Sequence, residues 1–215
     1  MLNHINAQNG ARILATFVDC EATSLNGYCT EVGFAQVWQG LPPTGHTTKI
    51  DPVPDTDTLF IRSDSRLVCV EEWLDDYLKW DPAAEKMTGI SRTMLLHSGY
   101  PANQVAIWLN DELAGLVVHS DARIFDSNWI DQVYGVAGMK RRFKIVQLER
   151  IAKRWDVNKS AFRGYCKGAF NTLHGSDKPH RAEADAVNWA KAFGQCWDEA
   201  LLNRSLFAKL AGSLL

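Results

Sequence analysis

The chain has 215 residues, of which 46% are hydrophobic and 22% are charged, and its formal net charge is −2. This composition is that of a folded globular protein and excludes disordered, collagen-like and low-complexity chains. No window approaches the ~18 apolar residues of a membrane span, and residues 1–12 lack the apolar core of a signal peptide. Five cysteines without a Cys-x-x-Cys pair indicate free thiols. We therefore expect a cytoplasmic protein without a membrane partner.

Charge is distributed unevenly along the chain. Residues 140–181 contain 12 Lys and Arg against three Asp and Glu, whereas the remaining residues contain 11 against 22. A basic segment of this kind is either the solvated face of helices or a surface that follows the phosphates of a nucleic acid.

The N-terminal third of the chain is predicted to open a β-sheet. The apolar run 12–18 and the alternating segment 30–38 are connected through Asn26-Gly27, which is typical of a β-hairpin with a short loop. Four of the seven prolines fall in 41–58, so this stretch is predicted to be a surface loop. Two short strands are expected after it, at 59–61 and 67–70.

Helices and short strands then alternate. Apolar spacing predicts a helix from Pro101 to near Gly115, a strand at 116–118, a helix at 126–136 and a strand at 143–146. The remainder is predicted to be mainly helical, at 147–155, 160–173 and 181–202.

Strands followed by helices that cross to buried strands indicate an α/β fold with a mixed sheet. We expect one folded domain at 12–203, preceded by a polar segment at 1–11 and followed by a tail at 204–215.

Two carboxylates stand at the end of the first strand. Asp19 and Glu21 follow the apolar run and, being two positions apart, would share one face of the strand. Two like charges this close repel each other unless a cation or protons lie between them, and a divalent metal ion would neutralise both. The alternative is a strand that merely ends in polar residues.

A third carboxylate, Asp126, lies on the apolar face of its own helix. It precedes Trp129, Ile130 and Val133 by three, four and seven positions. An unpaired charge on that face is costly, which again favours a cation nearby. The alternative is an acid that caps the helix or interacts with its dipole.

The fourth feature is a histidine before the last predicted helix. Pro179 suits the first turn of a helix, so His180 would lie at its entrance and Asp185 one turn inside. Two closely spaced metal ions need carboxylates from several elements, and a neutral histidine can take a proton from an attacking water. Taken alone, His180 would be a surface histidine.

These motifs together resemble those of the DEDDh 3′–5′ exonucleases. The segment Phe17–Leu25, followed by Glu31-Val32-Gly33, resembles the first motif of that family. Phe125-Asp126 resembles the second, and His180-x-Ala182-x-x-Asp185-Ala186 matches the third. The segment Lys86–Ile90 resembles the short Thr-Gly-Ile segment that these proteins carry between the first two motifs.

One position departs from the family pattern. A His-Asn pair usually stands a few residues before the Phe-Asp of the second motif, whereas this chain has His119-Ser120-Asp121 at a longer spacing and no Asn. Asp121 is therefore the alternative to Asp126 as the ligand from the second motif. Asp126 is preferred because the apolar helical stripe follows it directly.

The resemblance implies a ribonuclease H-like domain that acts as a metal-dependent 3′–5′ exonuclease on single-stranded DNA or RNA and releases nucleoside 5′-monophosphates. It implies that two Mg²⁺ or Mn²⁺ ions are held by Asp19, Glu21, Asp126 and Asp185, with His180 as general base. It also places Ala22, Thr23 and Leu25 at the 3′ end of the substrate, although Leu25 could equally be an ordinary core residue. Some relatives are dimers, so a homodimer is left open.

Two other functions remain open from the sequence. One is a binding module on the same fold that holds nucleic-acid ends or a protein partner without cleaving them. The other is a phosphodiesterase for very short oligonucleotides or nucleotide-like small molecules.

Overall fold

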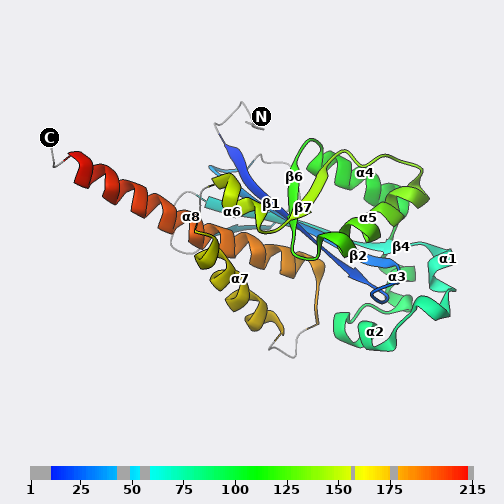
Figure 1. The fold of residues 1–215 in the computed structure, drawn as a ribbon. Coiled ribbons are helices and arrows are strands. Elements are labelled where there is room, and N and C mark those ends of the chain that lie inside the picture. The colour runs from blue at the N-terminus through cyan, green and yellow to red at the C-terminus, as the bar shows by residue number, and fades with distance from the viewer. Residues whose placement is uncertain (1–10, 43–48, 54–58, 156–157, 175–178, 213–215) are drawn as a thin grey trace.

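The computed structural model describes residues 11–42, 49–53, 59–155, 158–174 and 179–212. Among them, seven strands form a mixed sheet with helices on both faces (Figure 1), which confirms the predicted α/β class. The strands are β1 (Arg12–Ala22), β2 (Cys29–Gln39), β3 (Lys49–Pro52), β4 (Leu59–Cys69), β5 (Tyr100–Pro101), β6 (Val117–Ser120) and β7 (Lys144–Gln147).

The sheet has the order β3-β4-β2-β1-β6-β7, and β5 pairs with β4. The pairs β1–β2, β2–β4 and β4–β3 are antiparallel. On the other side of β1, β6 pairs parallel to β1 and β7 pairs parallel to β6. The carboxyl ends of β1, β6 and β7 therefore meet at one edge of the sheet, where the predicted site residues follow Val18 and Ser120.

The helices are α1 (Glu71–Leu74), η1 (Tyr77–Lys79), α2 (Pro82–Thr88), α3 (Arg92–Ser98), α4 (Ala102–Leu113), α5 (Arg123–Ala137), α6 (Arg150–Trp155), α7 (Lys159–His174) and α8 (Ala182–Gly212). Three hydrophobic clusters form the core of the described residues, and the two larger ones hold α4 to α8 to the sheet. On one face, α4 and α5 pack on Val18 and Phe34, and on the other α6, α7 and α8 pack on Leu14 and Phe17. Successive side chains of a strand point to opposite faces, so β1 contributes to both of these larger clusters.

Most predicted elements are present, and two are corrected. The strands expected at 59–61 and 67–70 are one strand, β4, and β3 forms inside the segment expected to be a loop. Much of that segment, 43–48 and 54–58, lies outside the described residues, as do 1–10 and 213–215 of the expected terminal segments. Helix α8 continues unbroken past residue 203, the expected end of the domain. No described helix is long and apolar enough to span a membrane.

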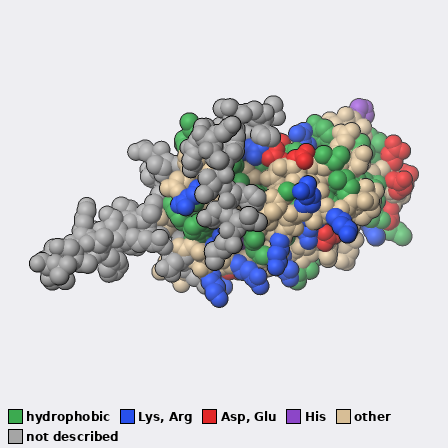
Figure 2. Space-filling view, turned by 90° about the horizontal axis from the view of Figure 1, so that it is seen from above, with side chains coloured by type: hydrophobic (Ala, Val, Ile, Leu, Met, Phe, Trp, Pro, Cys, Tyr) green, Lys and Arg blue, Asp and Glu red, His purple; other side chains and the backbone are tan. Residues whose placement is uncertain are grey.

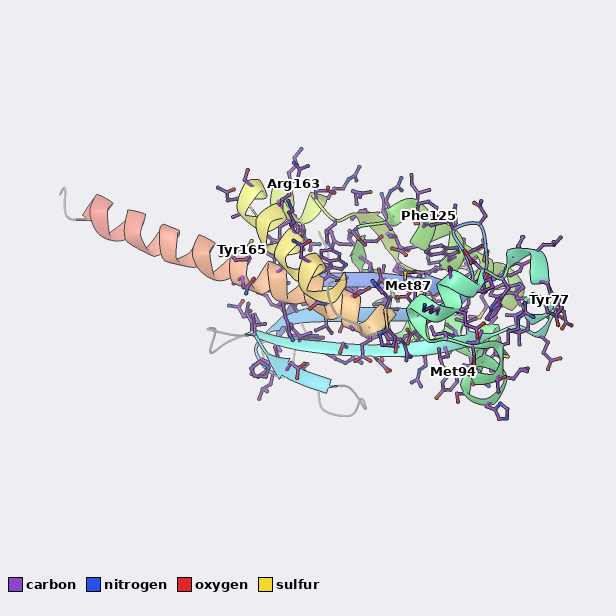
Figure 3. All side chains as sticks on the ribbon, turned by 90° about the horizontal axis from the view of Figure 1, so that it is seen from below. Tyr77, Met87, Met94, Phe125, Arg163 and Tyr165 are labelled. Atoms are coloured by element: carbon purple, nitrogen blue, oxygen red, sulfur yellow. The ribbon has the colours of Figure 1, made fainter. Side chains whose placement is uncertain are left out.

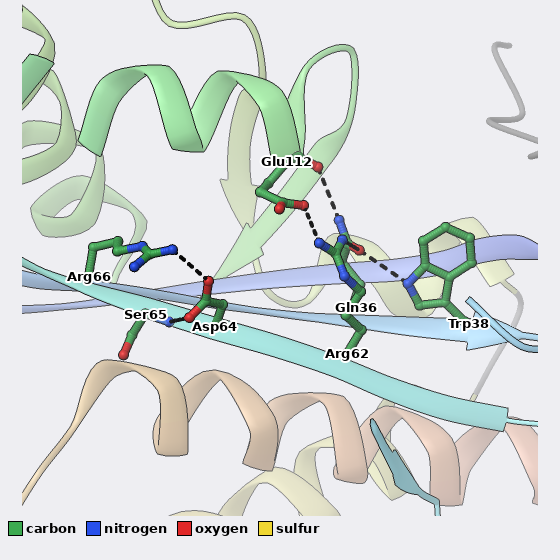
Figure 4. Close-up of polar contacts among 7 residues, drawn as sticks. All are labelled: Gln36, Trp38, Arg62, Asp64, Ser65, Arg66 and Glu112. Atoms are coloured by element: carbon green, nitrogen blue, oxygen red, sulfur yellow. Dashed lines mark hydrogen bonds and ion pairs between the residues drawn. The ribbon is translucent and has the colours of Figure 1, made fainter. Parts of the chain in front are cut away.

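A buried polar network explains why β4 is continuous. Arg62 donates to Glu112 Oε2 at 2.6 Å and to Gln36 Oε1 at 3.0 Å, and the indole of Trp38 donates to the same Gln36 oxygen (Figure 4). A buried charge is tolerated only when it is paired and hydrogen-bonded. These partners lie 26 and 50 positions away in sequence. The local sequence around Arg62 is polar and therefore indicates a loop, although Arg62 lies in the middle of a strand.

Candidate metal centre

The structure brings the sequence-predicted acidic residues together in two adjoining groups. The first contains Glu21, His180 and Asp185, and the second contains Asp19, Asp121 and Asp126. Within each group, one ligand atom from each residue lies within 4.8 Å of the others. These donors are five carboxylates and one imidazole, the ligand set that suits Mg²⁺ or Mn²⁺.

The parallel pairing of β1 with β6 creates the second group. Phe17 lies opposite His119 in the sheet, so the residues that follow each strand reach the same edge. Ser120, fully buried, donates its hydroxyl to Asp126 Oδ2, and Asp126 itself is 1% exposed on the first turn of α5. Asp121 Oδ1 is also buried and has no hydrogen-bond partner among the described residues. A cation would satisfy such an oxygen.

His119, two residues before Asp121, has a structural role beside this group. Its Nδ1 lies 3.0 Å from the carbonyl oxygen of Thr16, and burial lowers its pKa to about 4. The ring is therefore neutral at pH 7 and can donate to that carbonyl, which ties β6 to β1.

The first group depends on how α8 begins. Glu31 on β2 is buried, and its carboxylate accepts from Arg181 Nε at 2.9 Å, from Arg181 Nη2 at 2.7 Å and from the N–H of Ala182 at 3.0 Å. The carboxylate thus satisfies an N–H of the first turn of α8 and complements the helix dipole.

Gly33 lets that helix end approach β2. A Cβ at residue 33 would lie 2.3 Å from the backbone N of Glu183 and 2.4 Å from the carbonyl carbon of Ala182. Neither backbone atom can move without displacing the start of α8, so no larger residue fits. The Glu31-Val32-Gly33 segment of the first motif therefore supports the third motif in space.

His180 is fixed from two directions. Its backbone N–H donates to the carbonyl oxygen of Met87 at 3.0 Å, near the end of α2. Its Nδ1 lies 3.6 Å from Asp185 Oδ2, within ion-pair distance. The segment Lys86–Ile90, noted in the sequence, thus contacts the entrance of α8 through Met87.

Burial and mutual repulsion raise the pKa values of the acidic side chains. Desolvation, with Asp185 and Glu31 nearby, raises the pKa of Glu21 to about 8. Desolvation raises the pKa of Asp126 to about 7 against the opposing Ser120 hydrogen bond. The pKa of Asp19 is raised well above its usual value by burial and by Asp126, and burial raises that of Asp185 although His180 opposes this. Crowded carboxylates of this kind gain most from a bound cation.

The residues expected at the substrate's 3′ end lie in and after the end of β1. Ala22 ends the strand and is half-buried. The backbone N–H of Thr23 donates to the Tyr28 carbonyl at 2.9 Å and its hydroxyl donates to the Lys79 carbonyl at 2.6 Å, so Thr23 shapes the turn. Leu25 is 69% exposed, and the core interpretation of Leu25 is therefore wrong.

Sequence reasoning treated Asp121 and Asp126 as alternatives, whereas the structure places both beside Asp19. It did not identify Ser120 as the partner of Asp126. The only available signal was a hydroxyl residue at the end of a buried strand, which is too common to indicate a role.

The start of the basic segment lies away from these acids. Lys144 pairs with Val117 at the beginning of β6 and β7, and Lys140 and Arg142 come just before it. Asp121 follows the opposite end of β6, so residues 140–142 lie at the other end of these strands from the carboxylates. The later part of the segment, on α6 and α7, is exposed on the other face of the sheet. Figure 2 shows Lys and Arg side chains gathered along one edge of the molecule.

No protein-family profile and no curated protein matches the chain. Among solved structures, E. coli exonuclease I in complex with a dA16 oligonucleotide is similar over 86% of this chain and 42% of its own, with 12% identity and a TM-score of 0.52. The zinc-bound E. coli exonuclease I–ssDNA complex is similar over 92% and 43%, with 14% identity and a TM-score of 0.50. Exonuclease X with 5′-overhanging duplex DNA is similar over 86% and 92%, with 14% identity and a TM-score of 0.48.

The two exonuclease I likenesses show the fold alone. The chain has an α/β fold similar to that of part of E. coli exonuclease I, and it spans about two fifths of the exonuclease I chain. At 12–14% identity, a shared activity does not follow from the fold.

Proposed function

We propose that this chain is a DEDDh-type, metal-dependent 3′–5′ exonuclease that acts on single-stranded DNA or RNA. The observation that carries the proposal is the meeting of five carboxylates and one histidine, from β1, the β6–α5 connection, α5 and the start of α8, in two adjoining groups. A protein that only bound a partner would gain nothing from burying so many like charges. The exonuclease I neighbours are themselves complexes with single-stranded DNA, which supports this substrate class.

The donor set fits two divalent ions. Asp19, Glu21, Asp126 and Asp185 are the proposed ligands, and Asp121 Oδ1 is available to the same ions or to water beside them. When bound, two Mg²⁺ or Mn²⁺ ions stabilise charge on the phosphate and make water more acidic.

The protein side chains then perform the proton transfer. In this proposal His180 accepts a proton from the water whose oxygen attacks the terminal phosphorus, while Asp185 orients the imidazole through Nδ1. The new P–O bond forms as the bond from phosphorus to the O3′ of the preceding nucleotide breaks. That O3′ takes a proton from water, and a nucleoside 5′-monophosphate leaves. The exposed side chain of Leu25 would pack against the terminal base, and the backbone at Ala22 and Thr23 would hold the 3′ hydroxyl.

The remaining parts of the proposal concern the whole protein. The proposed catalytic unit is 12–203, with 1–11 and 204–215 outside it, although α8 itself continues to Gly212. The five free thiols fit a reducing, cytoplasmic setting. A homodimer stays open.

The test is degradation of 5′-labelled single-stranded DNA and RNA of one sequence, with Mg²⁺, Mn²⁺ or a chelator. The proposal predicts a metal-dependent ladder that shortens from the 3′ end and is absent with Asp126→Asn. Retained binding without shortening under any metal would overturn it and favour a binding module.

A further inference from the structure

A pocket of about 210 Å³ lies between α7, α8 and the segment that follows β7, outside the carboxylate groups. Its apolar walls are Leu148, Phe162, Cys166 and Trp189. This volume is smaller than the roughly 300–1,000 Å³ of pockets that hold drug-sized ligands, so it has room for about one planar ring system.

The pocket adjoins the connection that carries Asp121. The N–H of Leu148, in its wall, donates to the carbonyl oxygen of Ser120 at 2.8 Å, and Gln147 Nε2 donates to the carbonyl oxygen of Asp121 at 2.8 Å. A strand whose scissile phosphate lies at Asp19, Asp121 and Asp126 would therefore pass close to the pocket. Arg163 on α7 and Phe125 on α5 lie along the same edge of the molecule in Figure 3.

The pocket offers few polar contacts to an occupant. Trp189 and Glu149 line it, but their unpartnered atoms, Trp189 Nε1 and Glu149 Oε2, are almost wholly inaccessible to solvent and so do not face its open space. A ring that enters the pocket would therefore be held mainly by contact with its apolar walls.

Two cations stand at the mouth of the pocket. Arg163 and Lys167 line it, are exposed, and lie one helical turn apart on α7. An anionic group attached to the ring would meet them while the ring enters the pocket. Surfaces that bind single strands usually combine side chains against which the bases pack with cations that contact the phosphates.

We infer that this pocket takes one nucleobase of the bound strand, with its phosphate at Arg163 and Lys167. The inference rests on the proposed function, because it assigns the path of the strand beyond the carboxylates. We expect the pocket to hold a base of the bound strand rather than a free nucleoside monophosphate.

Two variants of the full chain test this pocket. Arg163→Gln with Lys167→Gln removes the cations at exposed positions, and Cys166→Trp fills the pocket. Fluorescence anisotropy with a labelled single-stranded 12-mer, with chelator and separately with Mn²⁺ on an Asp19→Ala background, measures binding. The charge variant should flatten the slope of log K against log salt by about 0.7, the contribution of one phosphate contact on a single strand. The filled variant should weaken binding about 5- to 150-fold, the worth of one stacked base.

The matched control is Lys140→Gln with Arg142→Gln, which removes two exposed cations at the other end of β7. An unchanged salt slope in the Arg163 and Lys167 variant, or an equal change in the control, would contradict the proposal that this pocket binds the strand. If Cys166→Trp lowers the melting temperature, Cys166→Leu replaces it. Competition by AMP or CMP that is stronger than by the 12-mer would also overturn the strand assignment. Binding is measured without cleavage, so the two proposals fail separately. If the wild-type protein degrades the strand but the pocket variants bind it normally, only the pocket is rejected. If the pocket variants bind more weakly but the wild-type protein degrades nothing, only the nuclease is rejected.

Discussion

Glu31 and Arg181 form a two-pronged ion pair across 150 positions of sequence, with the carboxylate on β2 and the guanidinium at the start of α8. Because the same carboxylate accepts the N–H of Ala182, the pair fixes where α8 begins. His180 and Asp185 lie on either side of that point. The geometry of the proposed third motif is therefore set by a residue of the first.

Glu31→Gln should weaken this support without removing any proposed metal ligand. Hydrogen bonds to charged groups contribute about 1.5–3 kcal/mol, so a loss of that order in the free energy of unfolding is expected. Turnover should fall at saturating substrate, with little change in KM, since His180 shifts while the strand surface is unchanged. Denaturant unfolding and steady-state kinetics measure the two effects. Ser65→Ala, which removes only one weaker partner of Glu31, is the control. Equal turnover in Glu31→Gln and wild type would contradict the positioning role.

Gly33→Ala should be more damaging than its size suggests. The added methyl group would overlap backbone atoms of Ala182 and Glu183, so α8 must move away from β2. We expect turnover to fall by at least about 10²-fold, because small displacements at a catalytic site have effects of that size. Gly135→Ala is the matched control, since no atom lies within 4 Å of a Cβ there. Similar activity of the two variants would show that the close approach is unimportant.

The metal-free protein should lose stability as pH rises from about 4 to about 8. The pKa values of Glu21 and Asp126 are raised to about 8 and about 7 in the folded chain, so both groups keep protons that the unfolded chain releases across this window. His119, with its pKa lowered from 6.5 to about 4, acts in the opposite direction below pH 6.5, but it is one group against two. Each kcal/mol lost lowers the melting temperature by about 2–4 °C in a chain of this size. Thermal unfolding with a chelator at pH 5, 6.5 and 8 measures the trend.

Mn²⁺ at pH 8 should reverse this loss, because it neutralises the ionised carboxylates. Asp126→Asn should show a smaller dependence on both pH and Mn²⁺. A melting temperature that rises between pH 5 and 8 without metal would contradict the electrostatic description of the site.

His180→Ala should reduce turnover about 10²- to 10⁴-fold, the usual contribution of a general base, while metal binding is largely retained. Calorimetric titration with Mn²⁺ and the rate on a single-stranded 12-mer measure the two properties. His97→Ala removes an exposed histidine on α3 whose Nδ1 contacts the Thr93 carbonyl, and it should behave as wild type. Undiminished turnover in His180→Ala would remove that residue from the mechanism.

Local patterns in the sequence predict much of this fold. The hairpin through Asn26-Gly27 and the apolar stripe on α5 depend on residues close together in sequence, and both are present in the structure. Arg62 is different, because its strand conformation depends on Gln36 and Glu112, which no local pattern reveals.

The candidate site divides in the same way. The spacing of Asp19 and Glu21 on one strand is visible in the sequence, as is the position of Asp126 on an apolar helical face. The joint placement of Asp121 and Asp126 beside Asp19 depends on how β6 pairs with β1, and the α7 pocket depends on how α7 packs on α8. Such relationships arise from tertiary packing, so sequence spacing alone does not predict them.

The most direct test of the central claim is the first product released from a single strand labelled only in its 3′-terminal nucleotide. Wild-type protein with Mn²⁺ should release the label as a nucleoside 5′-monophosphate before any shorter strand loses a second nucleotide. Asp126→Asn, which keeps the size of the side chain but removes its charge, should release almost none. Release of a 3′-monophosphate, of an oligonucleotide, or of equal label by both proteins would contradict a 3′–5′ exonuclease built on these carboxylates.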